Sequence, residues 1–371
     1  MNISQNLPVE LFKKSTLANL SVYGASHFLV DAICAGTIFS LLAKSTNLPE
    51  LALFIVIYNI LAFGLQLPLG ILSDKIMKPK QFTILGILLT AVAGVLALFF
   101  PLEGIVLAGI GNALFHIGGG SISLNLTPKK ASAPGIFVAP GALGLLVGTI
   151  LGKVGLFNPI IFGGIAVVLI IATLPLKTPN YLQSTKEKQK FNYLELIVML
   201  LLLTVVSRSI IGFAIVFPWK TNLLLLLALT IGVVLGKAFG GILGDKFGWT
   251  KIGVGGLIVS IPLIFLGPQY FVLGIIGMFL FNFTMPITLT ALSNLFPGKP
   301  GFAFGLTCMA LLIGALPFFS EIKGIFSDKI LIASMIAISA IILCIGLKLS
   351  KPNEKNNFIK KKTPNRKKGK K

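Results

Sequence analysis

The chain contains only two histidines, and each lies four positions from another polar residue inside an apolar stretch. His27 and Asp31 share one face of the first predicted apolar helix, and Asn112 and His116 share one face of the fourth. A carboxylate beside an imidazole at low dielectric stabilises the protonated ring, which suits a group that takes a proton from one side and releases it to the other. We therefore predict proton transfer. The alternative is that both rings only form hydrogen bonds with the backbone or Ser26.

Two cationic residues lie in apolar stretches of the second half of the chain, Arg208 and Lys237. Ionisable groups inside a membrane are costly and usually functional. Arg208 follows a serine as His27 does, which predicts that both face one cavity. One acid, Asp31, against two cations and two histidines predicts an electropositive cavity and an anionic ligand. Asn282 is expected to add a hydrogen bond there or to bridge helices. The alternatives are an Arg208–Asp31 ion pair and a Lys237 side chain that extends to the lipid headgroups.

Two short polar segments with one residue pattern interrupt the apolar stretches, and their aspartates are 171 positions apart. Each segment predicts a tight turn whose aspartate accepts hydrogen bonds from helix N-terminal amides and faces nearby lysines. The alternative is that the aspartate only caps the turn. The spacing indicates two copies of one unit. The residues of the segments are Gly70, Asp74 and Lys75 in the first, and Gly241, Asp245, Lys246 and Gly248 in the second.

The composition requires a membrane to surround these elements. The 371 residues have a mean hydropathy of +0.94 and only 12% are charged, whereas about a quarter are charged in soluble proteins. Apolar segments of about 20 residues, enough to cross a bilayer, recur along the chain. We predict an all-α membrane protein with about twelve transmembrane helices. The predicted domains are a lead at 1–16, six helices at 17–176, a linker at 177–192, six helices at 193–349, and a basic disordered tail at 350–371.

The formal charge of +21 would suggest nucleic-acid binding in a soluble protein, but its distribution argues against that partner. Twelve lysines lie in one set of alternating loops and five in the other. This asymmetry follows the positive-inside rule, so we expect both termini on the cytoplasmic side of the plasma (inner) membrane. The tail at 350–371 is expected either to contact anionic lipids or to remain solvated.

The three cysteines fall in apolar segments without paired spacing, so no disulfide or metal site is expected. No cleavable signal peptide is expected either, because the first apolar run is as long as a full span. No segment has the pattern of a phosphate-binding loop or a nucleophile triad. We therefore expect a protein that is not an enzyme and has no cofactor, with a proton gradient as its driving force.

The two acidic segments resemble a motif of the major facilitator superfamily, Gly-x-x-x-Asp-Arg/Lys-x-Gly-Arg/Lys. Gly241, Asp245, Lys246 and Gly248 match it in the second copy, and Met77 replaces the second glycine of the first copy. The resemblance implies two pseudo-symmetric six-helix bundles that alternate access to a central cavity. It also implies that the histidines line this cavity and that the aspartates form a state-dependent latch at a cytoplasmic gate.

The first half is similar to the fosmidomycin-resistance branch of exporters in that family. The similarity lies in residues 26–31, 66–68 and 115–116, whereas Ile117 and Gly118 replace the Pro-Glu that usually follows. We predict a monomeric secondary transporter of a small, anionic or phosphonate-like compound, with proton-coupled efflux by antiport as the first hypothesis. The alternatives are a proton-coupled importer or facilitator of an organic anion or nutrient, and a non-transporting receptor or scaffold.

Overall fold

In the computed structural model, the described residues are Leu11 and the ranges 13–44, 48–179, 193–319, 324–326 and 328–350. The first ten residues of the predicted lead, residues 180–192 of the predicted linker and all but the first residue of the predicted tail lie outside them. All regular elements in the described part are helical.

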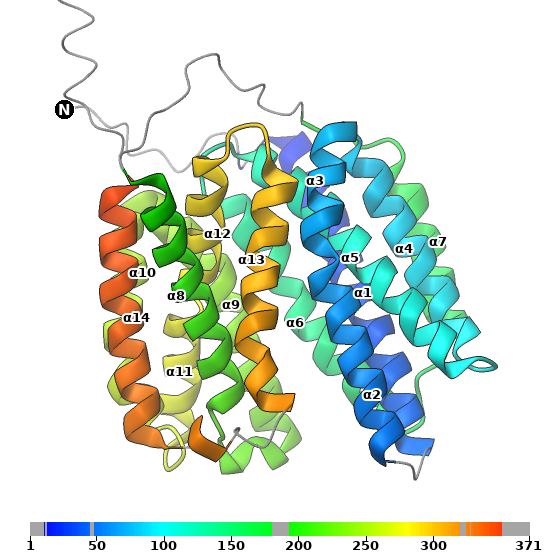
Figure 1. The fold of residues 1–371 in the computed structure, drawn as a ribbon. Helices are drawn as coiled ribbons and strands as arrows, with labels where there is room; N and C mark the ends of the chain where they lie inside the picture. Colours follow the sequence, from blue (N-terminus) through cyan, green and yellow to red (C-terminus); the bar gives the residue numbers. More distant parts are fainter. Residues whose placement is uncertain are drawn as a thin grey trace, which may run out of the picture.

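The segments that could cross a membrane alternate in direction along the chain, so each runs antiparallel to the next (Figure 1). The first eight elements are α1 (Lys14–Lys44), α2 (Leu48–Asn59), the π-helical turn η1 (Ile60–Gly64), α3 (Gln66–Ile76), α4 (Pro79–Leu96), α5 (Pro101–Leu126), α6 (Ser132–Lys153) and α7 (Pro159–Thr173). They are followed by α8 (Leu194–Ala214), the 3-10 turn η2 (Pro218–Thr221), α9 (Leu223–Phe247), α10 (Trp249–Leu266), α11 (Phe271–Phe281), α12 (Thr284–Leu295), α13 (Pro300–Ala315), the 3-10 turn η3 (Leu316–Phe319) and α14 (Lys329–Leu349).

Eleven helical segments of the described chain are long and apolar enough to cross a membrane, and α7 is a shorter apolar helix. One of the eleven joins α2, η1 and α3, and another joins α11 and α12. With α7 they account for the twelve predicted helices, and the all-α prediction is confirmed.

Local signals in the sequence explain where many of these helices begin. Proline occupies the first turn of α4, α5, α7 and α13, where its missing N–H leaves no hydrogen bond unmade. The side chains of Asn158, Asn222 and Asp328 accept hydrogen bonds from the first amides of α7, α9 and α14. These caps position the helices before any contact between helices forms.

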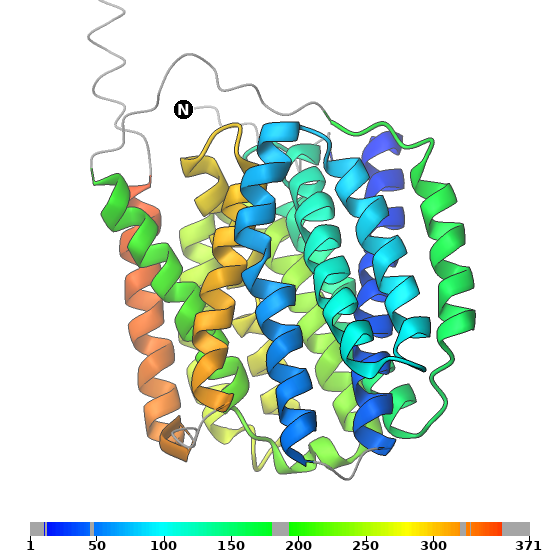
Figure 2. The same cartoon turned by 45° about the vertical axis from the view of Figure 1, so that its right-hand side comes forward.

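Two apolar cores hold the helices together, one mostly from the first half of the chain and one from the second. In Figure 1 the first-half helices lie to the right and the second-half helices to the left, with α7 at the outer right edge; α7 keeps this outer position in Figure 2. The most apolar window is 78% buried in α5 and 61% in α1, but only 22% in α9. The two histidine-bearing helices are therefore among the most enclosed.

Glycines let α6 lie directly against α1. A Cβ at Gly144 or Gly148 would collide with the backbone carbonyls of Phe28 and Ala32. Small residues at this spacing allow close helix approach in membranes. This contact places one face of α6 over the site that α1 carries.

Candidate functional site

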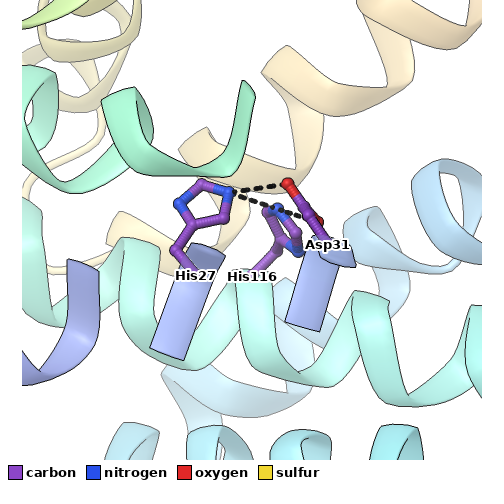
Figure 3. Close-up of side chains that lie close together, drawn as sticks. All are labelled: His27, Asp31 and His116. Carbon is purple, nitrogen blue, oxygen red and sulfur yellow. Dashed lines mark hydrogen bonds and ion pairs between the residues drawn. The ribbon is translucent and has the colours of Figure 1, made fainter. Parts of the chain in front are cut away.

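His27, Asp31 and His116 come together between α1 and α5 (Figure 3). The His27 Nε2 lies 3.3 Å from Asp31 Oδ2, the His116 Nε2 lies 3.8 Å from Asp31 Oδ1, and the two Nε2 atoms are 3.0 Å apart. The His27 side chain is 5% exposed, and those of His116 and Asp31 are 14% and 19% exposed. The cluster is thus enclosed but not sealed.

The hydrogen bonds of the two rings define their protonation. His27 Nδ1 lies 2.8 Å from the carbonyl oxygen of Phe137, and His116 Nδ1 lies 2.9 Å from that of Asn112. A carbonyl oxygen only accepts, so each Nδ1 carries a hydrogen. Two neutral rings would then turn two Nε2 lone pairs toward each other. A single added proton converts this contact into an N–H···N hydrogen bond, with the Asp31 carboxylate as its counter-ion.

A second polar chain extends from the cluster. Asn112 donates to Asp31 Oδ1 at 3.1 Å and to the Cys34 sulfur at 3.7 Å, and Cys34 also shares a hydrogen bond with Tyr58. Asp31 therefore has a partner at each oxygen, which fixes its orientation between the rings. Sequence reasoning assigned Cys34 only to an apolar segment, although it lies three positions after Asp31 on the same helix, and it missed Tyr58, whose spacing does not relate it to Asp31.

Gly141 on α6 leaves the space that the cluster occupies. A Cβ at this position would collide with the His27 ring, and it would lie 2.5 Å from Asp31 Oδ2. Phe137, one turn earlier on α6, supplies the carbonyl that orients His27. The site is consequently built by three helices of the first half.

Arg208 on α8 and Lys237 on α9 are cations of the second half, and Arg208 is related to the site through Lys237. Lys237 interacts electrostatically with Asp31, His116 and Arg208. Among the described residues, neither Arg208 nor Lys237 forms an ion pair or a side-chain hydrogen bond, and Arg208 Nε and Nη2 are buried without an acceptor. The alternative of an Arg208–Asp31 ion pair is therefore not found here. Within the described ranges, Lys237 is attracted by Asp31 at a distance, and neither cation has a carboxylate in direct contact.

The side chain of Asn282 forms a hydrogen bond within its own chain segment, and its predicted contact with a ligand stays a prediction. Its amide donates to the Met278 carbonyl at 2.8 Å, and it lies at the interruption between α11 and α12. Its buried side chain thus satisfies the backbone of its own interrupted helix.

The donor atoms of His27, Asp31 and His116 all lie within 4.8 Å of one another, so by type and spacing they could also hold a metal ion. The nearby cations Arg208 and Lys237 disfavour a divalent ion by charge repulsion. One proton already satisfies the facing Nε2 atoms. We therefore propose a proton, and not a metal ion, as the occupant of this cluster.

The first acidic segment joins the two halves of the chain. Asp74, near the end of α3, accepts hydrogen bonds from the amides of Gly301 and Phe302 at 2.8 and 2.7 Å. These amides begin α13 and have no partner within that helix. A Cβ at Gly70 would collide with the Gly301 carbonyl, so this glycine allows the contact.

The second acidic segment repeats this contact in reverse. Asp245, near the end of α9, accepts from the amides of Ala131 and Ser132 at 2.9 and 2.8 Å, where α6 begins. The Trp249 indole adds a third hydrogen bond at 2.9 Å. A Cβ at Gly241 would collide with the Ala131 carbonyl. Because successive membrane-crossing segments alternate in direction, the ends of α3 and α9 and the starts of α6 and α13 lie at one end of the bundle. This is the upper end in Figure 1.

The amides that donate to each aspartate therefore belong to a helix of the opposite half of the chain. They do not belong to the helix that follows the adjacent turn. Lys75 and Lys246 were expected to face the aspartates, but both are exposed and neither pairs with them; Lys246 lies over the Phe247 ring. Helix N-termini bind the carboxylates in place of these two lysines, and Lys299 interacts electrostatically with Asp74. Trp249 was also missed, although it follows Asp245 by four positions.

The residues after the two aspartates keep related backbone conformations. Gly248 ends α9 with a φ of +100°, and Met77, 171 positions earlier, ends α3 with a φ of +57°. The methionine thus adopts a left-handed conformation that favours glycine. The first copy keeps the turn despite its departure from the motif.

Comparison with known proteins places this geometry in a family. The model described as Major Facilitator Superfamily matches residues 20–317. The uncharacterized MFS-type transporter YfnC of Bacillus subtilis (strain 168) is 25% identical over 353 residues, which cover 80% of this chain and 84% of YfnC.

Solved structures share the fold. The E. coli fucose:proton symporter FucP aligns with a TM-score of 0.64 and 12% identity over 90% of this chain and 98% of that chain. The human organic anion transporter MFSD10 (TETRAN) aligns with a TM-score of 0.60 and 12% identity over 91% of this chain and 100% of that chain. These similarities confirm the predicted arrangement of two helical bundles.

Proposed function

This chain belongs to the Major Facilitator Superfamily and is a multi-pass membrane transporter of small molecules; from this premise we propose that it carries an anion and couples its movement to a proton. The observation that carries the anion proposal is the pair of uncompensated cations, Arg208 and Lys237. Charges left without a counter-ion at low dielectric are strongly unfavourable. A bound anion supplies the missing charge.

The proton proposal rests on the facing imidazoles. His27 and His116 accommodate one proton between their Nε2 atoms, and Asp31 balances its charge. His116 is partly exposed and interacts electrostatically with Lys237 of the opposite half. A change in the relative position of the halves therefore changes the field at the proton, which is what coupling requires.

Alternating access is proposed to use the two carboxylate contacts between the halves. Asp74 and Asp245 hold α13 and α6 at the end of the bundle that we propose is cytoplasmic. Opening this end breaks both sets of hydrogen bonds at once. We propose that both termini lie on this side of the plasma (inner) membrane, that the protein works as a monomer, and that the basic tail contacts anionic lipids.

Export by proton antiport is the mode favoured by the resemblance to the fosmidomycin-resistance exporters. Import of the anion together with the proton is the second candidate, and the charges of the site favour it. An anion beside Arg208 and Lys237 attracts the proton shared by the histidines, so each ligand strengthens binding of the other. FucP is a fucose:proton symporter and MFSD10 is an organic anion transporter, so the fold accommodates both features.

Proton movement in reconstituted vesicles tests the function. Vesicles that contain a pH-sensitive dye are given a panel of carboxylates and phosphonates, chosen beforehand by a growth screen of an expressing strain against toxic members of both classes. We expect anion-dependent proton movement that His116→Ala and Asp31→Asn abolish and Lys153→Gln, at the opposite end of the bundle, preserves. Protons that move with the anion indicate symport, and protons that move against it indicate antiport. Unchanged proton movement in both site variants refutes the coupling site.

A further inference from the structure

One edge of the Arg208 guanidinium lacks any acceptor. Nε and Nη2 are both shielded from water and unpartnered, and no other hydrogen bond or ion pair of this side chain is found among the described residues. An unmade hydrogen bond at a buried group costs about 1–3 kcal/mol, and more at a charged one. An unpaired group of this kind in a folded protein is explained when a ligand supplies the acceptor on binding.

The two unpartnered atoms have a specific geometry. Nε–H and the adjacent Nη2–H point in parallel from one edge of the planar guanidinium, which matches two oxygens of one carboxylate, phosphate or phosphonate. A monatomic anion or the single oxygen of a neutral amide can reach both donors only through bent, weaker hydrogen bonds. The edge therefore selects by shape as well as by charge.

No acidic group near this edge is free to fill it. Asp31 Oδ1 accepts from Asn112 and faces His116, and Oδ2 faces His27. The other groups with electrostatic contact to the site are Lys237 on α9, which repels Arg208, and Cys308 on α13. The acceptor must accordingly come from outside the described chain.

We propose that the Nε–Nη2 edge of Arg208 binds a two-oxygen anionic group of the substrate, with Lys237 as the second cation. The inference rests on the proposed function as an anion transporter and adds the class of substrate, an organic carboxylate or phosphonate. It also assigns distinct roles to the two cations. Arg208 orients the anionic group by two parallel hydrogen bonds, and Lys237 contributes charge without defined geometry.

Ligand-induced stabilisation of the purified full-length protein tests this proposal without any flux measurement. The thermal midpoint is titrated with succinate and methylphosphonate, and with chloride and neutral succinamide as matched controls. In the unmodified protein we expect succinate, methylphosphonate or both to raise the midpoint at concentrations where chloride and succinamide have no effect. If chloride stabilises the protein equally, the proposal that Arg208 recognises two oxygens is refuted. If neither succinate nor methylphosphonate stabilises it, the proposed substrate class is refuted.

Variants separate geometry from charge. Arg208→Lys keeps the charge and loses the parallel donors, so the apparent Kd is expected to rise at least about tenfold, the equivalent of one charged hydrogen bond. Lys237→Gln should weaken all anions without changing their order, and Lys153→Gln should bind as the unmodified protein does. Unchanged affinity in Arg208→Lys refutes the proposal. Anion binding that follows these expectations without proton movement in vesicles refutes proton coupling alone and leaves the anion site intact.

Discussion

The carboxylate of Asp74 accepts a 2.8 Å hydrogen bond from the amide of Gly301, although the two residues are 227 positions apart. Each of these residues belongs to a different half of the chain, so the bond exists only while the halves meet at this end. A charged acceptor at a helix N-terminus stabilises through both hydrogen bonding and the helix dipole. We therefore propose that this contact is a latch whose strength sets the population of the closed state.

Removing one latch charge should open this end of the bundle. A hydrogen bond to a charged group contributes about 1.5–3 kcal/mol, so Asp74→Asn is expected to shift the equilibrium at least about tenfold toward the open state. Distances between spin labels at the ends of α3 and α13 measure this change. Glu103→Gln, on the exposed first turn of α5 at the opposite end, is the control. A distance distribution equal to that of the unmodified protein would show that the latch contributes nothing.

Asp245→Asn should have the smaller effect on that equilibrium. Trp249 and Asp245 belong to the same half, so their hydrogen bond is kept whether or not the halves meet. The Asp245 carboxylate therefore keeps one hydrogen-bond donor in the open state. The same spin-label measurement, made at the ends of α9 and α6, compares the two variants. A larger shift for Asp245→Asn than for Asp74→Asn contradicts the asymmetry.

Side chains at the two latch glycines should prevent closure. Gly70→Val and Gly241→Val place a Cβ against the carbonyls of Gly301 and Ala131, so both variants are expected to stay open at this end. Cysteine accessibility from that side reports the state. Gly255→Val is the matched control, because no atom lies within 4 Å of a Cβ there. Equal accessibility in all three variants would show that closure does not require the close backbone contacts at Gly70 and Gly241.

The histidine pair gives a direct spectroscopic prediction. Because the chain has only two histidines, nitrogen-15 NMR of histidine-labelled protein contains only their ring signals. We expect both Nδ1 atoms protonated and one proton shared by the two Nε2 atoms. Asp31→Asn removes the counter-ion and should weaken the signal of the shared proton relative to the unmodified protein. Two neutral rings protonated at Nε2 would contradict the hydrogen-bond assignment.

The ends of α3 and α9 should respond differently to substitution. Gly248 has a φ of +100°, so Gly248→Ala is expected to cost about 1–3 kcal/mol of backbone strain. Met77 already occupies a left-handed conformation at φ +57°, and Met77→Gly relieves strain while increasing the entropy of the unfolded chain, so a small change is expected. Thermal midpoints of the two variants measure the contrast, and a comparable loss in both would refute it.

Hydropathy alone determined the class of this protein, because a bilayer of fixed thickness requires apolar helices of fixed length. The number of helices followed from it, with α7 shorter than expected. Local spacing also placed His27 beside Asp31 and Asn112 beside His116, since residues four apart share a helix face. The two acidic segments indicated the internal repeat for the same reason, because a repeated unit preserves its local pattern.

Contacts between helices were decided only by tertiary structure. The 3.0 Å approach of the two imidazoles joins residues 89 positions apart, and it depends on how Gly141 and its neighbours let α6 close over α1. The partners of Asp74 and Asp245, and the absence of one for Arg208, depend likewise on which helices pack together. Spacing along the sequence shows which residues share a face of one helix. It does not show which helices pack together, because that depends on how the shapes of their surfaces fit.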